Sequence, residues 1–360
     1  MSHNKPARYF SALPSYFGGK RKLVPYIFGA LDRLVSSPKW GKYHFIDAFS
    51  GGGSVSLAAK AYGFGCVYSN DWSLRSNIIH RGLLDNKSIF LTRTDVLSMA
   101  TYPNKSFHPN LQNLVGTVFS ERHALALSQG LHYADSLQCQ TKKALVLLLL
   151  WKLVLEYVAF GTSVGTSNRP FVEVLDGKKP WYSLNPKRLR DKSFSRLLEP
   201  SWTHIERHRK AINRGVFGAG GETRTFQEDV FKFLPQVSGQ ILYLDPPYPG
   251  TLSYEKENKV LDQVLFGERD LDSYGISPFT EDIGALSQLL KQATHIQIWL
   301  VSLNNKIIDE RELGDFIKAI DPKRKVETNS WKYGHLSHVS NSERNRELLV
   351  TAYVPKDKGK

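Results

Sequence analysis

The pattern of apolar and polar positions along the chain predicts a sheet covered by helices. Three short β-like runs, at residues 44–46, 66–68 and 241–244, each lead into a turn rich in glycine or acidic residues and then into a helical pattern. Residues 296–302 alternate enough to form a half-buried strand, and residues 348–354 are a fifth candidate. We therefore expect an α/β fold whose sheet is interrupted by a long middle segment.

The longest apolar run, residues 144–160, has about the length of a helix. It is broken by Lys152 and Glu156, which are four positions apart and which the centre of a bilayer would tolerate poorly. The run therefore predicts a buried helix with an i,i+4 ion pair rather than a membrane span. Because the N-terminal residues also lack a continuous apolar region of the secretory type, we expect a cytoplasmic protein with no membrane partner.

Basic residues are concentrated in the middle of the chain. The 360 residues include 48 Lys and Arg and 34 Asp and Glu, a formal net charge of +14. Residues 96–221 alone contain 17 basic and 8 acidic residues, a net charge of +9. This asymmetry predicts a basic, mainly helical module at 96–221, inserted into a sheet domain formed by residues 1–95 and 222–360.

One stretch of this module, residues 181–196, mixes several Lys and Arg with Trp181, Tyr182 and Phe194. Cations interleaved with flat aromatic rings suit phosphate contacts together with base stacking. A solvated basic surface is the alternative interpretation.

The sequence offers no set of residues typical of a metal site. Cys66 and Cys139 are too few for a disulfide framework or a thiolate zinc site, and they fit a reducing compartment. His204 and His208 are four apart, but Ile205 stands where a zinc-protease helix would carry glutamate. We therefore expect no metal.

A glycine-rich turn follows the first predicted strand. Asp47 ends that strand, and Gly51, Gly52 and Gly53 precede a predicted helix, so the backbone there can approach a ligand closely. The turn is not a dinucleotide fingerprint, because Ser56 occupies the third small position, and no lysine follows to make a phosphate loop. A carboxylate beside such a turn suits a ligand that carries an ammonium group.

A second acid follows the next predicted strand. Asp71 comes 24 residues after Asp47, near the spacing at which an acid binds ribose hydroxyls in nucleotide-binding folds. A ribose without a pyrophosphate indicates a nucleoside cofactor. The alternative is structural, because Asn70 and Asp71 also suit a turn or a helix N-cap.

The most informative segment is ILYLDPPY at residues 241–248. It delivers a carboxylate, two rigid prolines and an aromatic ring to the carboxyl end of a buried strand, where open α/β sheets bind ligands. The prolines remove two backbone donors, so the carbonyls of Asp245 and Pro246 can accept from an incoming group. Together with the Asp245 carboxylate they suit an NH2 group, and Tyr248 suits stacking on a base.

Four segments resemble the Dam-type DNA adenine methyltransferases, which use S-adenosylmethionine. They are YFGGK at residues 16–20, DAFSGGGS at 47–54, SNDWS at 69–73 and DPPY at 245–248. Their order also matches that family, with a target-recognition insert before DPPY. FQEDVFKFL resembles the family's third cofactor-side segment, with Asp229 as its acid. The resemblance implies a Rossmann-like methyltransferase sheet covered by helices.

The resemblance implies that one set of residues binds S-adenosylmethionine: Tyr16, Lys20, Asp47, Phe49, Ser50, Gly51, Gly53, Asp71, Asp229 and Asp245. Tyr16 and Lys20 would close over the methionine end, and Asp47 would line the pocket with the glycine turn. Asp71 would hold the ribose hydroxyls, and Asp229 would lie beside the cofactor adenine.

It also implies that Asp245, Pro246, Pro247 and Tyr248 form the catalytic segment. Asp245 would accept a hydrogen bond from the target amino group, Pro246 would offer its carbonyl, and Tyr248 would stack on a flipped adenine. An adenine amino group is a poor nucleophile because its lone pair is delocalised into the ring. Two hydrogen-bond acceptors on the amino group would make the nitrogen pyramidal and so free its lone pair. With the methyl donor held in line, catalysis would then come from positioning and electrostatics.

The sequence thus predicts a site-specific methyltransferase that transfers a methyl group to N6 of adenine in duplex DNA. The resemblance leaves open a companion restriction endonuclease. The alternatives are an RNA adenine methyltransferase, a DNA cytosine-N4 methyltransferase and a non-catalytic DNA-binding protein with a retained cofactor fold. Residues 255–275 form a longer charged loop than the family usually has, and its role is not predicted.

Overall fold

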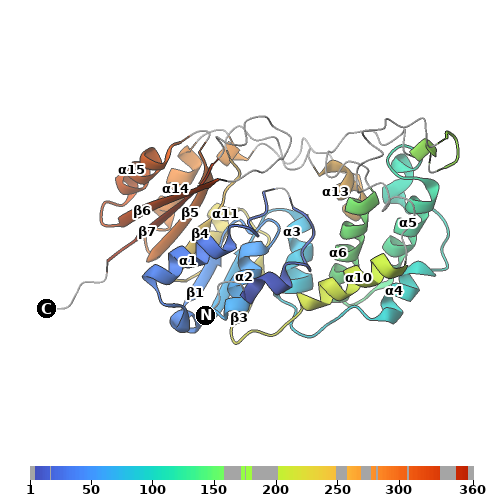
Figure 1. Cartoon of the computed structure of the whole chain (residues 1–360), viewed down its shortest axis with the longest axis horizontal. Coiled ribbons are helices and arrows are strands. Elements are labelled where there is room, and N and C mark those ends of the chain that lie inside the picture. Colours follow the sequence, from blue (N-terminus) through green and yellow to red (C-terminus); the bar gives the residue numbers. More distant parts are fainter. Residues whose placement is uncertain are drawn as a thin grey trace.

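The computed structural model describes residues 5–16, 18–157, 172–174, 176–180, 202–248, 258–268, 277–280, 283–305, 308–332 and 346–355. Figure 1 shows a sheet flanked by helices at one end and a group of helices at the other end. One prediction, for residues 181–196, falls outside the described ranges. Of the predicted loop at 255–275, residues 258–268 are described, and Lys259–Phe266 form a helix, α13, so the prediction of a loop is wrong there.

Seven strands form one mixed sheet in the order β3-β2-β1-β4-β5-β7-β6. Strands β1 to β5 are parallel to one another, and β7 is antiparallel to both β5 and β6. The strands are β1 (His44–Asp47), β2 (Cys66–Asn70), β3 (Glu222–Phe226), β4 (Ile241–Leu244), β5 (Ile298–Asn304), β6 (Lys325–Lys332) and β7 (Arg346–Tyr353). The predicted α/β class is confirmed.

The sequence pattern does not predict β3 and β6, which are the two edges of this sheet. Both strands are polar, ETRTF and KVETNSWK, and none of the β3 side chains is fully buried. An edge strand takes its backbone hydrogen bonds from one neighbour and leaves much of its surface in water. The hydrophobic signal on which strand prediction depends is therefore weak there.

Alternating residues of the central strands point to opposite faces of the sheet. Phe45 and Ile241 belong to the core under α1 and α2, whereas Ile46 and Leu242 belong to the core under the C-terminal helices. The flanking helices are α1 (Val24–Leu34) and α2 (Ser54–Tyr62) on one face, and α11 (Val230–Phe233), α14 (Gly284–Gln292) and α15 (Glu310–Ile320) on the other. The sheet is thus covered on both sides, as parallel strands require.

The remaining helices pack around a third core. They are α3 (Leu74–Ile79), α4 (Arg93–Ala100), α5 (Glu121–Ser136), α6 (Gln140–Tyr157), α10 (Trp202–Arg214) and α13 (Lys259–Phe266). This core also includes Leu57 of α2. The helical part is therefore packed directly against the sheet part, and α13, although it follows β4 in the chain, packs against α6.

Helix α6 confirms the predicted buried helix, but the predicted ion pair within it is wrong. Lys152 Nζ instead donates to the carbonyls of Ser11 at 3.0 Å and Leu13 at 2.9 Å. Glu156 Oε1 lies 3.0 Å from Nε2 of His208 on α10. Buried carbonyls of the N-terminal segment and a polar side chain on a packed helix outcompete the intrahelical pair, so Lys152 anchors the N-terminal segment to α6. Among the described helices, none combines the length and apolarity needed to cross a membrane.

Candidate active site

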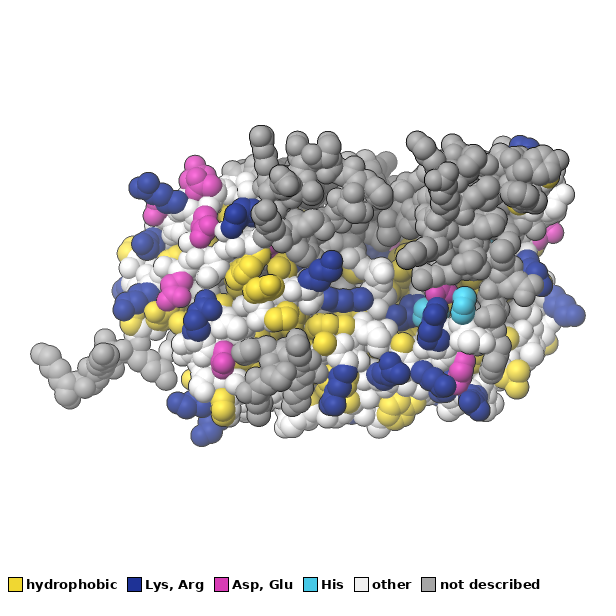
Figure 2. All heavy atoms as spheres, in the orientation of Figure 1, with side chains coloured by type: hydrophobic (Ala, Val, Ile, Leu, Met, Phe, Trp, Pro, Cys, Tyr) yellow, Lys and Arg dark blue, Asp and Glu magenta, His cyan; other side chains and the backbone are white. Residues whose placement is uncertain are grey.

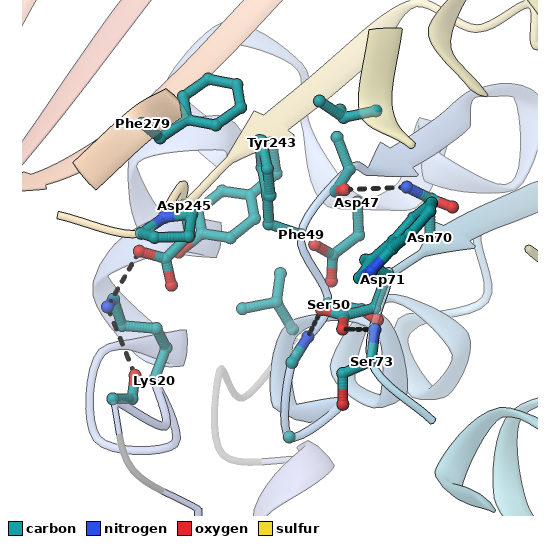
Figure 3. Close-up of a pocket in the computed structure, with 18 of the residues that line it drawn as sticks. Lys20, Asp47, Phe49, Ser50, Asn70, Asp71, Ser73, Tyr243, Asp245 and Phe279 are labelled. Carbon is teal, nitrogen blue, oxygen red and sulfur yellow. Dashed lines mark hydrogen bonds and ion pairs between the residues drawn. The ribbon is translucent and has the colours of Figure 1, made fainter. Parts of the chain in front are cut away.

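A cavity of about 320 Å³ opens at the carboxyl ends of β1 and β4. From β1 the chain moves outward to β2 and β3, and it returns with β4 on the other side of β1. Parallel sheets bind ligands where the strand order reverses in this way, because the loops after neighbouring strands diverge there and leave a crevice. Figure 3 shows side chains from the loops after both strands converging on this space.

The cavity gathers most of the residues that the sequence predicts for the site. Its lining includes Tyr16, Lys20, Asp47, Phe49, Ser50, Gly51, Asp71, Asp229, Asp245 and Pro247. Gly53, Pro246 and Tyr248 lie outside this lining. The structure thus brings together segments from five separate parts of the chain.

The glycine turn makes room for Tyr16 as well as for a ligand. A Cβ atom on Gly52 would lie 2.7 Å from Cβ of Tyr16, closer than such atoms approach. Gly51 and Gly53 have φ angles of 47° and 71°, in the left-handed region where glycine is favoured. The turn therefore packs against the N-terminal segment, and these glycines are required by the protein's own side chains.

Asp47 is fully buried at the end of β1. Its Oδ2 accepts a hydrogen bond from Ser56 Oγ at 2.6 Å, but its Oδ1 is buried with no hydrogen-bond partner among the described residues. Burial, with smaller contributions from the charges of Asp245 and Asp71, raises the pKa of Asp47 to about 7. An orphaned buried carboxylate oxygen is costly, so the site is suited to a cationic donor such as an ammonium group.

His80 supports the turn from behind and was not predicted by the sequence. Its Nε2 lies 2.7 Å from Oγ of Ser50 and 3.2 Å from Oγ of Ser69. Burial lowers the pKa of His80 to about 3, so the ring is neutral at physiological pH. His80 therefore serves as a neutral hydrogen-bonding group that fixes Ser50 at the cavity wall.

Asp71 faces the cavity from the end of β2. Its Oδ2 accepts from the Gly51 backbone N–H at 2.7 Å, and its Oδ1 accepts from the Ser73 N–H at 2.8 Å. Burial raises its pKa, and these hydrogen bonds oppose that rise. Asp71 therefore caps a turn, as the structural interpretation of the sequence expects. It also lines the cavity, where a hydroxyl-bearing ligand can reach it.

Aromatic rings form another wall of the cavity. Phe49 and Phe279 lie edge to face with ring centroids 5.1 Å apart, and Phe279 stacks on Phe231 at 5.7 Å. Asp229 lies beside them and accepts the Phe231 N–H at 2.9 Å as the N-cap of α11. Flat apolar surface next to a carboxylate suits a heterocyclic base with an exocyclic amino group.

A buried polar cluster joins the loop after β4 to the N-terminal segment. Lys20 Nζ lies 3.0 Å from Asp245 Oδ1, 3.2 Å from Glu347 Oε1 and 2.7 Å from the Tyr248 hydroxyl. That hydroxyl lies 3.0 Å from Asp245 Oδ1 and 2.5 Å from Glu347 Oε1, and its single proton can go to one carboxylate at a time. Lys20 is therefore held between two carboxylates.

This cluster sets the protonation of Asp245. Burial raises the pKa of Asp245 to about 6, the positive charge of Lys20 opposes the rise, and Glu347 adds to it. Among the described contacts both side-chain donors reach Oδ1, which leaves Oδ2 as an acceptor at the cavity that Asp245 lines. The Tyr248 ring is only 7% exposed, so stacking on a base would require it to leave this position.

The sequence did not predict several residues that line the cavity. Ser277, Pro278 and Phe279 follow the long charged loop and carry no motif, so their place in the cavity depends on the fold alone. Glu347 had a weak signal, as an acid next to the apolar run of the C-terminal strand. Asn70 lies within the SNDWS segment. Its Nδ2 donates hydrogen bonds to the Ala48 carbonyl at 3.3 Å and to the Glu228 carbonyl at 3.1 Å. Within the described ranges, no group of three His, Cys, Asp or Glu could hold a metal ion.

Comparisons with known proteins agree with this geometry. Residues 16–313 match the family model described as D12 class N6 adenine-specific DNA methyltransferase. The chain is also 25% identical over 303 residues to the Type II methyltransferase M2.HphI of Haemophilus parahaemolyticus, which covers 83% of this chain and 84% of that protein. Residues 16–313 include all four motif segments, and strands β6 and β7 follow the matched range.

Proposed function

Because the chain belongs to the D12 class N6 adenine-specific DNA methyltransferase family, we propose that its cavity binds S-adenosylmethionine and that Asp245 receives the target adenine. The enzyme methylates N6 of adenine in DNA, which decides against the RNA, cytosine-N4 and non-catalytic alternatives. The observation that carries the proposal is that Asp47 and Asp245, at the ends of neighbouring strands β1 and β4, meet at one cavity.

The residues of the cavity fit the proposed cofactor. The orphaned Oδ1 of Asp47 suits the ammonium group of the methionine end, and Asp71 suits the ribose hydroxyls. The walls formed by Phe49 and Phe279, with Asp229 alongside, suit the adenine ring. When bound, S-adenosylmethionine supplies a methyl group activated by its sulfonium. The protein's contribution is to orient the acceptor in line with that group.

Asp245 would prepare the acceptor nitrogen. Its Oδ2 can accept one N6–H bond while the Pro246 carbonyl accepts the other, which withdraws the lone pair from the ring and directs it at the methyl group. Lys20 and Tyr248 hold Oδ1 and keep the carboxylate ionised and oriented. As the N6–C bond formed and the S–C bond of the cofactor broke, N6 would become cationic and would lose a proton, which the Asp245 carboxylate can accept.

Access to the amino group requires the target adenine to leave the duplex. An exocyclic N6 lies inside the stacked helix, and enzymes that modify such atoms rotate the nucleotide into a pocket. The proposed stacking partner is Tyr248, once its ring has moved out of the buried cluster. In this proposal residues 1–95 and 222–360 carry catalysis, and residues 96–221 recognise the target, supported by the packing of α5, α6 and α10 around one core.

The biological setting is also part of the proposal. The similar protein from Haemophilus parahaemolyticus is named a Type II methyltransferase, and we extend that role to this chain: methylation of a specific site, with a companion restriction endonuclease as partner. A cytoplasmic location fits the DNA substrate and the two cysteines, buried Cys66 and exposed Cys139, which are both unpaired.

Transfer of a labelled methyl group from S-adenosylmethionine to unmethylated plasmid DNA tests the proposal. We expect N6-methyladenine after digestion to nucleosides with the wild type and none with Asp245→Ala, whose DNA binding should stay within about threefold of the wild type. Asp315→Ala, which removes an exposed acid on α15, is the matched control. Methylation that survives Asp245→Ala, or DNA binding lost in parallel with activity, would contradict the role given to Asp245.

A further inference from the structure

Helix α10 carries basic side chains along one exposed side. Arg207, Lys210 and Arg214 are exposed and are spaced by three and four residues, which places them on one face of the helix. Ile205 and Ile212 point the other way and are buried in the helical core. The three cations, called here the α10 basic stripe, extend along about 10 Å of helix.

The α10 basic stripe lines a hollow of about 840 Å³ in the protein surface. The rest of the lining comes from α6 and from the N-terminal segment, which contributes the half-buried cation Arg21. Two acids of the lining already have side-chain partners: Glu206 lies 2.6 Å from Arg209, and Glu156 lies 3.0 Å from His208. Figure 2 shows Lys and Arg side chains over the region of α10, and others are spread along the rest of this face. The hollow is therefore strongly positive.

The charges of the stripe are available to a partner. In the described part of the chain, neither Lys210 nor Arg214 has an acidic group within 4.0 Å, and Arg207 makes one contact with Glu156 at 3.4 Å. None of the large exposed apolar side chains of the described residues lines the hollow. A membrane surface would call for such anchors, so the chemistry favours a hydrophilic polyanion.

The hollow lies next to the methylation site. Ser15 and Arg21 line the hollow, whereas Tyr16 and Lys20, between them in the chain, line the cofactor cavity. Lys152 on α6 holds this segment in place by donating hydrogen bonds to the Ser11 and Leu13 carbonyls. A polyanion held in the hollow would thus run beside the cavity that receives the base.

We infer that the hollow with its α10 basic stripe holds the sugar-phosphate backbone of duplex DNA beside the flipped adenine. The inference rests on the proposed function, because that function supplies the polyanion. Lys and Arg on a rigid helix suit phosphates two or three positions along one strand, and such contacts set orientation without reading sequence. The stripe should therefore contribute to affinity for any duplex.

The test compares Arg207→Ala/Lys210→Ala/Arg214→Ala with Lys291→Ala/Lys318→Ala/Lys323→Ala, which removes the same charge from exposed positions on and near α14 and α15. Fluorescence anisotropy with a 30-base-pair duplex, repeated over a series of KCl concentrations, gives Kd and its salt dependence. Each lost phosphate contact lowers the slope of log Kd against log salt by about 0.9.

We expect the stripe variant to bind DNA on the order of 10- to 100-fold more weakly at about 100 mM KCl, with a slope lower by about 2 to 3. The control variant should stay within about threefold of the wild type. The double variant Arg207→Lys/Arg214→Lys should keep most of the wild-type slope of log Kd against log salt. Phosphate contacts depend more on the positive charge than on the two-pronged shape of the guanidinium group. Equal behaviour of the stripe and control variants overturns the inference.

Two further measurements separate this inference from the proposed function. Thermal melting and S-adenosylmethionine affinity should match the wild type in both triple variants, so that a folding defect is detected. If the wild type transfers no methyl group but the slope difference persists, the proposed function fails and the DNA surface stands. If transfer proceeds but the stripe variant binds DNA like the control, or loses affinity only for phosphatidylserine vesicles or folded RNA, the inference fails alone.

Discussion

Lys20 Nζ lies 3.0 Å from Oδ1 of Asp245, so a cation from the N-terminal loop contacts the acid that follows β4. Both side chains are largely buried, at 4% and 15% exposure. A buried charge needs a partner, and the second carboxylate, Glu347, shares the same ammonium group at 3.2 Å. Burial raises the pKa of the proposed catalytic acid, and two residues from opposite ends of the chain then shift it, Lys20 downward and Glu347 upward.

Replacing Lys20 should move the acidic limb of the pH–rate profile to higher pH. Lys20 lowers the pKa of Asp245, which lies at about 6. In Lys20→Met that effect is lost, so the pKa rises and a higher pH is needed to ionise the acid. Single-turnover methylation measured from pH 5 to 9 would reveal the shift, and Lys20→Arg should return the limb most of the way. An unmoved limb would exclude Lys20 as the partner that sets this ionisation.

Replacing Glu347 should move the same limb in the opposite direction. Its negative charge raises the pKa of Asp245, whereas Glu347→Gln keeps hydrogen-bonding capacity toward Tyr248 and Ser302, which contact its Oε1 at 2.5 and 2.7 Å. We expect the pKa to fall and activity to persist at lower pH. The two variants serve as controls for each other, because a general loss of structure would not shift the limb in opposite directions.

Asp47→Asn should weaken S-adenosylmethionine binding and stabilise the free protein at alkaline pH. Loss of one charge-assisted hydrogen bond costs about 1.5–3 kcal/mol, or roughly 10- to 100-fold in Kd by calorimetry. The folded pKa of about 7 exceeds the unfolded value, so the wild type loses stability as pH rises toward 7. The asparagine cannot ionise, and its Tm should exceed the wild-type Tm more at pH 8 than at pH 5.

The control for that change is Asp315→Asn on the exposed surface of α15, which should alter neither quantity. Wild-type cofactor affinity should also increase as pH rises through about 7, because the ionised form of Asp47 is the one that binds an ammonium group. Affinity that is independent of pH between 6 and 8 would contradict the assignment of Asp47 to the methionine end.

Asp71→Ala should weaken the cofactor and also loosen the turn. The carboxylate accepts from the Gly51 and Ser73 backbone N–H groups, so its removal leaves two donors without their partner in addition to losing the ribose contact. Calorimetry should give a Kd for S-adenosylmethionine raised by about tenfold or more. S-adenosylmethionine and its 2′,3′-dideoxyribose analogue should then bind Asp71→Ala about equally. A preference for the natural ribose that persists in the variant would argue that Asp71 acts only on the turn.

The parts of the fold that the sequence predicted are those buried on both faces. β1 and β4 show apolar runs because helices cover both of their sides, whereas the edge strands β3 and β6 take their backbone bonds from one neighbour and keep polar side chains. The pairing of β3 and β6 depends on the neighbouring strand that each one meets in the folded sheet, and the local sequence does not record that neighbour. The antiparallel position of β7 between β5 and β6 likewise depends on packing that no local pattern records.

The same distinction applies to the site. Asp47, Asp71 and Asp245 were predictable because Asp47 ends a strand and the other two directly follow one, and parallel strands deliver their carboxyl ends to one edge. Glu347 and His80 were not, since each acts through a side chain that tertiary packing brings near: His80 through Ser50 and Glu347 through Lys20.

A pair of glycine substitutions should separate backbone strain from steric conflict at the two ends of α2. Gly53 and Gly63 both have positive φ angles, 71° and 82°, so alanine is strained at either position. A Cβ on Gly53 would lie 2.6 Å from Cγ2 of Ile79, whereas nothing lies within 4 Å of one on Gly63. We expect Gly63→Ala to lower the free energy of unfolding by about 1 kcal/mol, and Gly53→Ala by about 1–3 kcal/mol more, measured by urea titration. Ile79→Ala should recover part of the lost free energy of unfolding only when it is combined with Gly53→Ala. If the two glycine variants lose the same free energy of unfolding, the turn can shift away from Ile79. The wall of the cofactor cavity would then be less rigid than its packing implies.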